Sequence, residues 1–166
     1  MAGVLAIVAV VAAGASDRLR EGADVAQSAL WAAGYSPREQ HLLATLASVA
    51  RAELDAGTAE IVLAPPGFGG DGIVVTGSRM AAQRLGVRVA AGEGTAGRAL
   101  ATGRTSLAEP RVALAVPIPG ASRLIGAVVV ESAGPERLFG GREAARLEAM
   151  VAQTAPQLVA PIGRTA

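Results

Sequence analysis

Two apolar runs separated by a short turn stand out in the second half of the chain. Residues 113–118 read ALAVPI, residues 125–130 read IGAVVV, and PGASR lies between them at 119–123. Runs of this length around a Gly- and Pro-containing turn predict a β-hairpin. Because both runs are almost continuously apolar, we expect the hairpin to be central and covered on both faces. Pro117 has no N–H for a sheet ladder, so the strand should end or bulge there.

Three segments carry helical periodicity instead. A helix is expected from Gly141, with a kink or end near Thr154 because Pro156 follows. A second helix should begin at the capping-box sequence SPRE (36–39) and end at Gly57. A third is expected over 17–33, capped by Ser16 and closed by Gly34. Their apolar stripes are Ala144, Leu147, Val151, Thr154 and Leu158; Leu43, Leu46, Ala50 and Leu54; and Leu19, Ala23, Ala26, Leu30 and Ala33.

The middle of the chain predicts shorter elements. Strands are expected over 59–64, 73–76 and 87–91, a short helix over 78–85, and a helix over 95–102 closed by Gly103. Residues 92–97 match G-x-G-x-x-G, which allows either a dinucleotide-binding turn or a tight turn into that helix. The second reading is favoured, because a hairpin follows where a Rossmann unit needs a parallel βαβ. The Gly-rich loop 65–72 lacks the Gly-Lys-Ser/Thr ending of a phosphate-binding loop.

Composition narrows the possible chemistry. The 166 residues are 51% hydrophobic but only 2% aromatic, with a net charge of +1. All the basic residues are arginine, which indicates GC-rich, bacterial coding, and they form no cluster that would support nucleic-acid binding. The absence of cysteine excludes disulfides, thiol catalysis and Cys-ligated zinc. The one histidine, His41, has polar neighbours, so a surface position is favoured over a haem or metal ligand. We expect no cofactor, no metal and no enzymatic activity.

Residues 3–15, GVLAIVAVVAAGA, carry no charge. The run is shorter than the roughly 20 residues of a membrane span. It also lacks the preceding positive charges of a secretory signal, although AGA at 13–15 would pass as a cleavage site. A buried helix is therefore favoured over a strand, a signal peptide or a span. We expect a cytoplasmic protein.

The order of motifs over residues 92–158 resembles the GAF family. The chain runs GEGTAGRALATGRTSLAEP (92–110), a strand ending VPIP (116–119), LIGAVVVE (124–131), LFGGRE (138–143) and a final helix. The resemblance extends more weakly back to residue 38. It implies an α+β fold with an antiparallel sheet of five to six strands between helices. The expected organisation is an N-terminal helical extension over 1–36, a stand-alone GAF-like domain over 37–160 and a tail over 161–166.

The resemblance also implies where a ligand and a partner would bind. Arg98 and Arg111 are the fixed charges near the expected pocket wall, and an Arg fork suits a carboxylate or phosphate. The favoured alternative is that both are exposed to solvent or paired with Glu93 and Glu109. Any ligand would be a small anionic or apolar metabolite. The absence of Cys and Lys excludes attached bilins, methionine sulfoxide reduction and the Asn-Lys-Phe-Asp-Glu signature of cyclic-nucleotide binding. The expected pocket wall is Met80, Val89, Thr95, Arg98, Leu107, Arg111, Ala113 and Val116. The expected face for a homodimer or partner protein is Leu43, Leu46, Ala50, Leu54, Leu147, Val151 and Leu158.

Two hypotheses follow for a non-catalytic regulatory protein. A small-molecule sensor needs a pocket of at least ~300 Å³ with convergent polar groups on the loop side of the sheet. A protein-interaction scaffold needs instead a filled interior and a helical surface that recruits a partner or a second copy. The short loops, the small side chains and the long apolar N-terminal run favour the scaffold.

Overall fold

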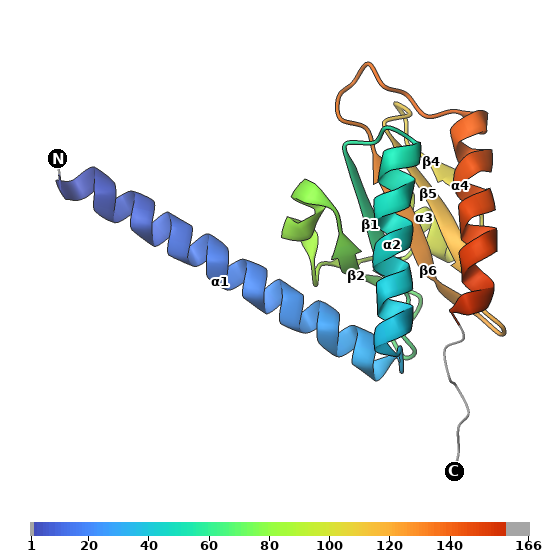
Figure 1. The fold of residues 1–166 in the computed structure, drawn as a ribbon, viewed down its shortest axis with the longest axis horizontal. Helices are drawn as coiled ribbons and strands as arrows, with labels where there is room; N and C mark the ends of the chain where they lie inside the picture. Colours follow the sequence, from blue (N-terminus) through green and yellow to red (C-terminus); the bar gives the residue numbers. More distant parts are fainter. Residues whose placement is uncertain (1, 159–166) are drawn as a thin grey trace, which may run out of the picture.

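The computed structural model describes the backbone of residues 2–158 and the side chains of residues 16–158, except those of residues 79, 80 and 82. Within this part, one antiparallel six-stranded sheet has the order β3-β2-β1-β6-β5-β4 (Figure 1). Helices cover both of its faces, which confirms the expected α+β class. The strands are β1 (Thr58–Leu63), β2 (Gly72–Gly77), β3 (Arg88–Val89), β4 (Ser106–Leu107), β5 (Ala113–Pro119) and β6 (Leu124–Glu131).

The predicted hairpin is β5 and β6, and it occupies the middle of the sheet. β6 pairs with β1 on one side and with β5 on the other. Residues 125–130 are all buried, as their continuous apolar character predicts. The expectation for Pro117 is wrong in detail, since β5 continues to Pro119 and its register shifts only between Ile118 and Pro119. The proline is tolerated at a place where β4, which pairs only with Leu114 and Ala115, has already ended.

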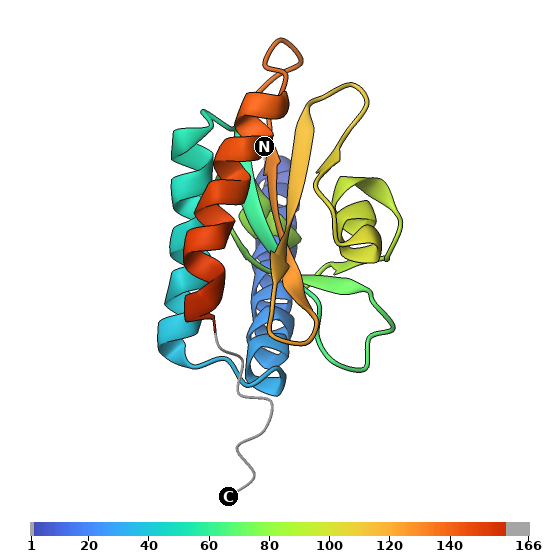
Figure 2. The same cartoon turned by 90° about the vertical axis from the view of Figure 1, so that its right-hand side faces the viewer.

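Two helices, α2 (Pro37–Glu53) and α4 (Gly141–Thr154), cover one face of the sheet (Figure 2). The predicted capping box is present at the start of α2: Glu39 N donates to Ser36 Oγ, and Ser36 N donates to Glu39 Oε2. α2 ends at Glu53, before the expected Gly57. Gly57 instead packs so closely on Ala133 that a side chain would not fit. Proline 156 lies in a single 3₁₀ turn, η2 (Ala155–Gln157), which ends α4 as predicted.

The other face carries α3 (Gly94–Thr102), as Figure 2 shows on the opposite side of the sheet from α2 and α4. Gly103 closes this helix in the left-handed conformation (φ 63°), so the prediction for its end is confirmed. The expected strand over 87–91 forms only the two residues of β3, and the expected helix over 78–85 is the 3₁₀ helix η1 (Arg79–Arg84). The two-residue strand β4 was missed, because so short an element has no period to detect.

A long helix, α1 (Ala2–Ala32), replaces the two separate segments expected at the N-terminus. Ser16 therefore lies inside a helix and does not cap one. The second half packs on β2 and η1 through Ala26, Ala29 and Leu30, whereas Leu19 is exposed. The helix runs from the junction with α2 outward past the body of the protein (Figure 1). Buried residues on both sides of the expected domain boundary at 36 therefore belong to the same hydrophobic core as the sheet.

Candidate functional site

The space between α3 and the sheet is the place where the resemblance predicts a ligand, and side chains of the chain fill it. Ala96, Ala99 and Leu100 of α3 pack directly on the sheet. The strand residues beneath them are Val62, Val74, Ala115, Ala127 and Val129. A Cβ added at Gly97 would overlap the carbonyl oxygen of Ala90, so the entry to α3 is also tightly packed. This interface is a second small core.

The described members of the predicted pocket wall are divided between the two faces of the sheet and the surface. Val89 packs on the α3-side core and Thr95 is half-buried on α3, but Leu107 and Val116 belong to the core on the opposite side of the sheet. Ala113 is buried at the start of β5. The side chain of Met80 lies outside the described residues.

The two arginines of the predicted wall are both exposed. Arg98 Nε donates to Ser106 Oγ (3.2 Å) and its Nη2 donates to the carbonyl oxygen of Leu107 (3.2 Å), which fixes α3 against β4. Arg111 lies in the bend before β5, where its backbone carbonyl accepts a hydrogen bond from Phe139 N (2.8 Å). The guanidinium of Arg98 is therefore engaged in holding the fold.

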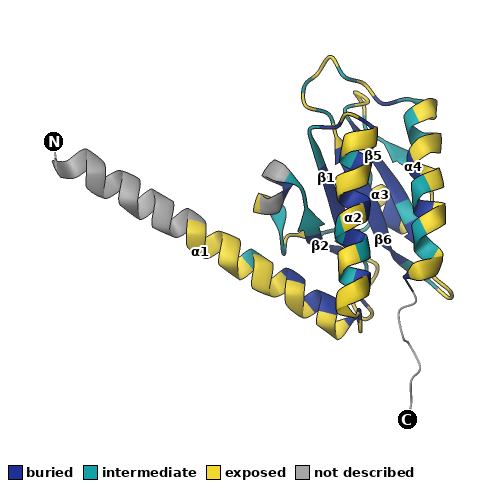
Figure 3. Cartoon of the chain, viewed as in Figure 1, coloured by how far each residue is buried: buried dark blue, intermediate teal, exposed yellow. Residues whose placement is uncertain are grey.

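The seven residues predicted to form the partner face do not lie on the surface. All seven side chains are buried between the helices and the sheet, and Figure 3 shows the outer surfaces of α2 and α4 to be formed by other positions. The stripes were identified correctly as apolar, but the surface that they meet is the sheet of the same chain. These buried residues are Leu43, Leu46, Ala50, Leu54, Leu147, Val151 and Leu158.

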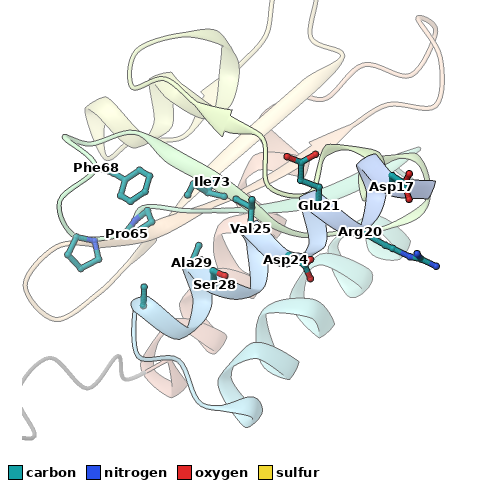
Figure 4. A pocket seen from close by; sticks show the side chains of 12 residues that line it. Asp17, Arg20, Glu21, Asp24, Val25, Ser28, Ala29, Pro65, Phe68 and Ile73 are labelled. Carbon is teal, nitrogen blue, oxygen red and sulfur yellow. The ribbon is translucent and has the colours of Figure 1, made fainter. Parts of the chain in front are cut away.

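An open groove of about 760 Å³ runs along the second half of α1 (Figure 4). Its other wall is the β1–β2 loop, with Pro65 and Phe68, and its floor includes Ile73 of β2. From α1, Val25, Ala29 and Ala32 contribute apolar surface. Val25 remains 43% exposed although it is a large apolar side chain. The apolar N-terminal run predicts that this region needs a partner, which is a partial signal for this site.

Charged side chains gather at the N-terminal end of the groove. Asp17, Arg20, Glu21 and Asp24 project from α1 there, whereas Phe68, Pro65 and Ile73 mark the apolar end (Figure 4). Arg88 lies over the Phe68 ring, 5.7 Å from its centroid, and pairs with Asp71 at 2.8 Å. These contacts hold the β1–β2 loop in place as a wall. The groove therefore offers an apolar trough with a polar end, which suits an elongated apolar segment.

A buried carboxyl group lies on the α3 side of the sheet at β1. Glu60 is only 4% exposed, and Arg84 Nη1 of η1 lies 3.0 Å from its Oε1. Burial raises the pKa of Glu60 to about 7. The positive charge of Arg84 lowers this pKa, and the negative charge of Glu131 raises it by a smaller amount. The sequence does not single out Glu60, because one glutamate in an apolar strand is typical of a position that faces solvent.

His41 is exposed on α2. Among the described residues, no group of three or more His, Cys, Asp or Glu side chains is arranged to hold a metal ion. Within the same part of the chain, no helix combines the length and the apolar character that a membrane crossing needs.

Comparison with known proteins identifies the fold. No protein-family model matches the sequence, and no curated protein matches it. Among solved structures, the chain is similar to the GAF domain of a phosphoenolpyruvate-protein phosphotransferase from Acinetobacter, with a TM-score of 0.64, 15% identity, and 83% of this chain and 92% of that chain covered. It is also similar to the GAF-B domain of DevS from Mycobacterium smegmatis (TM-score 0.62, 15% identity, 72% and 92% covered). A putative GAF sensor protein from Burkholderia vietnamiensis matches with a TM-score of 0.55 and 20% identity over 86% and 89% of the chains. The protein has a GAF-like fold.

Proposed function

We propose that this chain is a non-catalytic regulatory module that acts by self-association through α1. The observation that carries the proposal is the apolar groove along residues 17–32 of α1, which leaves Val25 and Phe68 exposed. The filled interface between α3 and the sheet supports an association module over a sensor that holds its ligand there. The similarity to a putative GAF sensor protein and to a domain of a phosphotransferase is consistent with a regulatory role.

The occupant of the groove would be the first half of α1 from a second copy. α1 is one continuous helix of 31 residues, and its residues 3–15 carry no charge. A two-fold axis near residue 17 would place residues 3–15 of each copy, antiparallel, along residues 19–31 of the other. Each groove would then be filled by an uncharged segment of matching length, and the interface would be reciprocal, as in a closed dimer. Asp17 would lie at the axis. Arg20, Glu21 and Asp24 would lie opposite residues 14, 13 and 10 of the other copy, with their charged groups at the edge of the interface in contact with water.

Sedimentation equilibrium of the full chain tests this function. The expected mass is twice the 16.5 kDa of one chain. Val25→Asp places an unpaired charge in the groove and should weaken the dimer by about tenfold or more. Ala23→Asp adds the same charge to α1 at an exposed position that does not line the groove, and should leave the dimer intact. A monomeric wild-type protein, or equal effects of the two substitutions, would contradict the proposal.

A further inference from the structure

A separate cavity of about 540 Å³ lies where three distant segments meet. The β5–β6 turn forms one wall, the end of α4 with η2 forms another, and Tyr35 reaches it from the junction of α1 and α2. Ile125, Ala155 and Leu158 contribute apolar lining. The cavity is on the α2 and α4 side of the sheet and shares no lining residue with the groove along α1.

Two donors stand out in this apolar surface. Arg123 is the one charged side chain among the described residues that line the cavity. Its Nη1 donates to the carbonyl oxygen of Ala64 (3.2 Å), which anchors the guanidinium and leaves the rest of its five N–H donors available. Tyr35 is 3% exposed, and no described residue makes a hydrogen bond to its hydroxyl group.

The surroundings of Tyr35 keep its hydroxyl group protonated, so that it can donate a hydrogen bond. Burial raises the pKa of Tyr35 to about 12, and the nearby charge of Arg123 lowers it by less than burial raises it. The phenol is therefore neutral at physiological pH and can donate to an anion. The nearby Glu39 does not line the cavity, and its Oε2 accepts from both Ser36 N (2.8 Å) and Ser36 Oγ (2.6 Å). No acidic side chain among the described lining residues would repel a negative ligand.

We propose that this cavity binds small carboxylates with an apolar body, whose carboxylate is held by Arg123 and the Tyr35 hydroxyl. One guanidinium matches the single charge and the planar shape of a carboxylate. The apolar lining from Ile125, Ala155 and Leu158 suits a hydrocarbon chain or ring better than a hydrated phosphate ester. The site goes beyond the proposed self-association, and its occupancy can be measured whether or not α1 pairs.

The chain contains one tyrosine, so 3-fluorotyrosine labelling gives a single ¹⁹F reporter inside the proposed site. Titration with octanoate should shift this resonance saturably, whereas 1-octanol and octylammonium, which have the same apolar chain, should bind about tenfold more weakly or not at all. Arg123→Gln should weaken octanoate binding by about tenfold or more. The exposed Arg142→Gln on α4 should change the affinity by less than about twofold.

A second variant keeps the test valid if Arg123→Gln fails to fold. Tyr35→Phe retains the buried ring and removes only the hydroxyl, so it should lose affinity severalfold by calorimetry while circular dichroism stays unchanged. The proposal is overturned if octanoate gives no saturable shift, if 1-octanol binds equally well, or if folded Tyr35→Phe and Arg123→Gln proteins bind as tightly as wild type. A monomeric protein that binds octanoate would contradict the proposed self-association and would still support the carboxylate site.

Discussion

Leu100 of α3 packs against the backbone of Gly72 in β2, so closely that a Cβ at Gly72 would lie 2.8 Å from Leu100 Cδ1. The same Cβ would overlap Cγ1 of Val62 in the neighbouring strand. This contact leaves no room for a large ligand between Leu100 and this part of the sheet, because the helix lies directly on the strands. A GAF-like fold can thus keep its architecture while the space under its short helix is closed by alanine, valine and one leucine.

The first prediction follows from that contact. Gly72→Ala should lower the free energy of unfolding by about 1–3 kcal/mol, because Val62 is stiff at its χ1 angle and cannot move aside without strain. Urea denaturation measures the loss. Gly134→Ala is the matched control, since a Cβ there would meet no atom within 4 Å, and its effect should stay within about 0.5 kcal/mol. Equal stabilities for the two variants would show that α3 is not closely packed on the sheet.

The position of α1 depends on a second glycine. Gly22 approaches the turn that follows η1 so closely that a Cβ would overlap the carbonyl oxygen of Leu85. Gly22→Ala should therefore displace this part of α1 and lower the free energy of opening its second half by about 1–3 kcal/mol. Hydrogen exchange of the amides of residues 23–33 measures the change, and Ala23→Ser, at an exposed neighbouring position, serves as control. Unchanged protection in Gly22→Ala would mean that α1 does not pack on the backbone at Leu85 as described.

Glu60 should make stability depend on pH. Its pKa rises from 4.5 to about 7 in the folded protein, so the folded state binds more protons than the unfolded state between these values. The free energy of unfolding should therefore fall as pH rises from about 4.5 to about 7, by at most about 3 kcal/mol. Denaturation of wild type and Glu60→Gln across this range measures the effect, which Glu60→Gln should largely abolish.

The exposed Glu109→Gln is the control for that experiment and should keep the wild-type pH dependence. The pKa of Asp71 is lowered, first by the hydrogen bond from Ala91 N, and that of Glu143 is lowered by backbone hydrogen bonds. Both shifts act at more acidic pH than the Glu60 window and in the opposite direction, since stability is lost as these groups are protonated. A flat wild-type profile from pH 5 to 7 would place Glu60 in contact with solvent.

Local patterns were sufficient to predict most of the elements. The capping box at Ser36, the left-handed Gly103 and the end of α4 before Pro156 are short-range features, and each was predicted from residues within one or two turns. The central hairpin followed from two apolar runs around a turn. Together with the motif order over 92–158, these features were enough for the fold class.

The site could not be predicted in the same way, because it depends on which face each residue takes. In β5 every residue from Ala113 to Val116 is apolar, so alternation does not reveal that Val116 faces α2 and α4 while Ala115 faces α3. The stripe of α2 gave no sign that its partner is the sheet of the same chain. Tyr35 and Arg123 are 88 positions apart, and they line one cavity because the fold brings the α1–α2 junction close to the β5–β6 turn.

The account depends most on the antiparallel pairing of α1, and one distance tests it. Because the chain has no cysteine, Trp31→Cys gives a single site for a spin label on an exposed position of α1. With the two-fold axis near residue 17 and a rise of 1.5 Å per residue, double electron–electron resonance should give a label separation of roughly 40 Å. A parallel pair would hold the labels within roughly 20 Å, since packed helices lie about 10 Å apart. That shorter distance, or no dipolar modulation at all, would contradict the account.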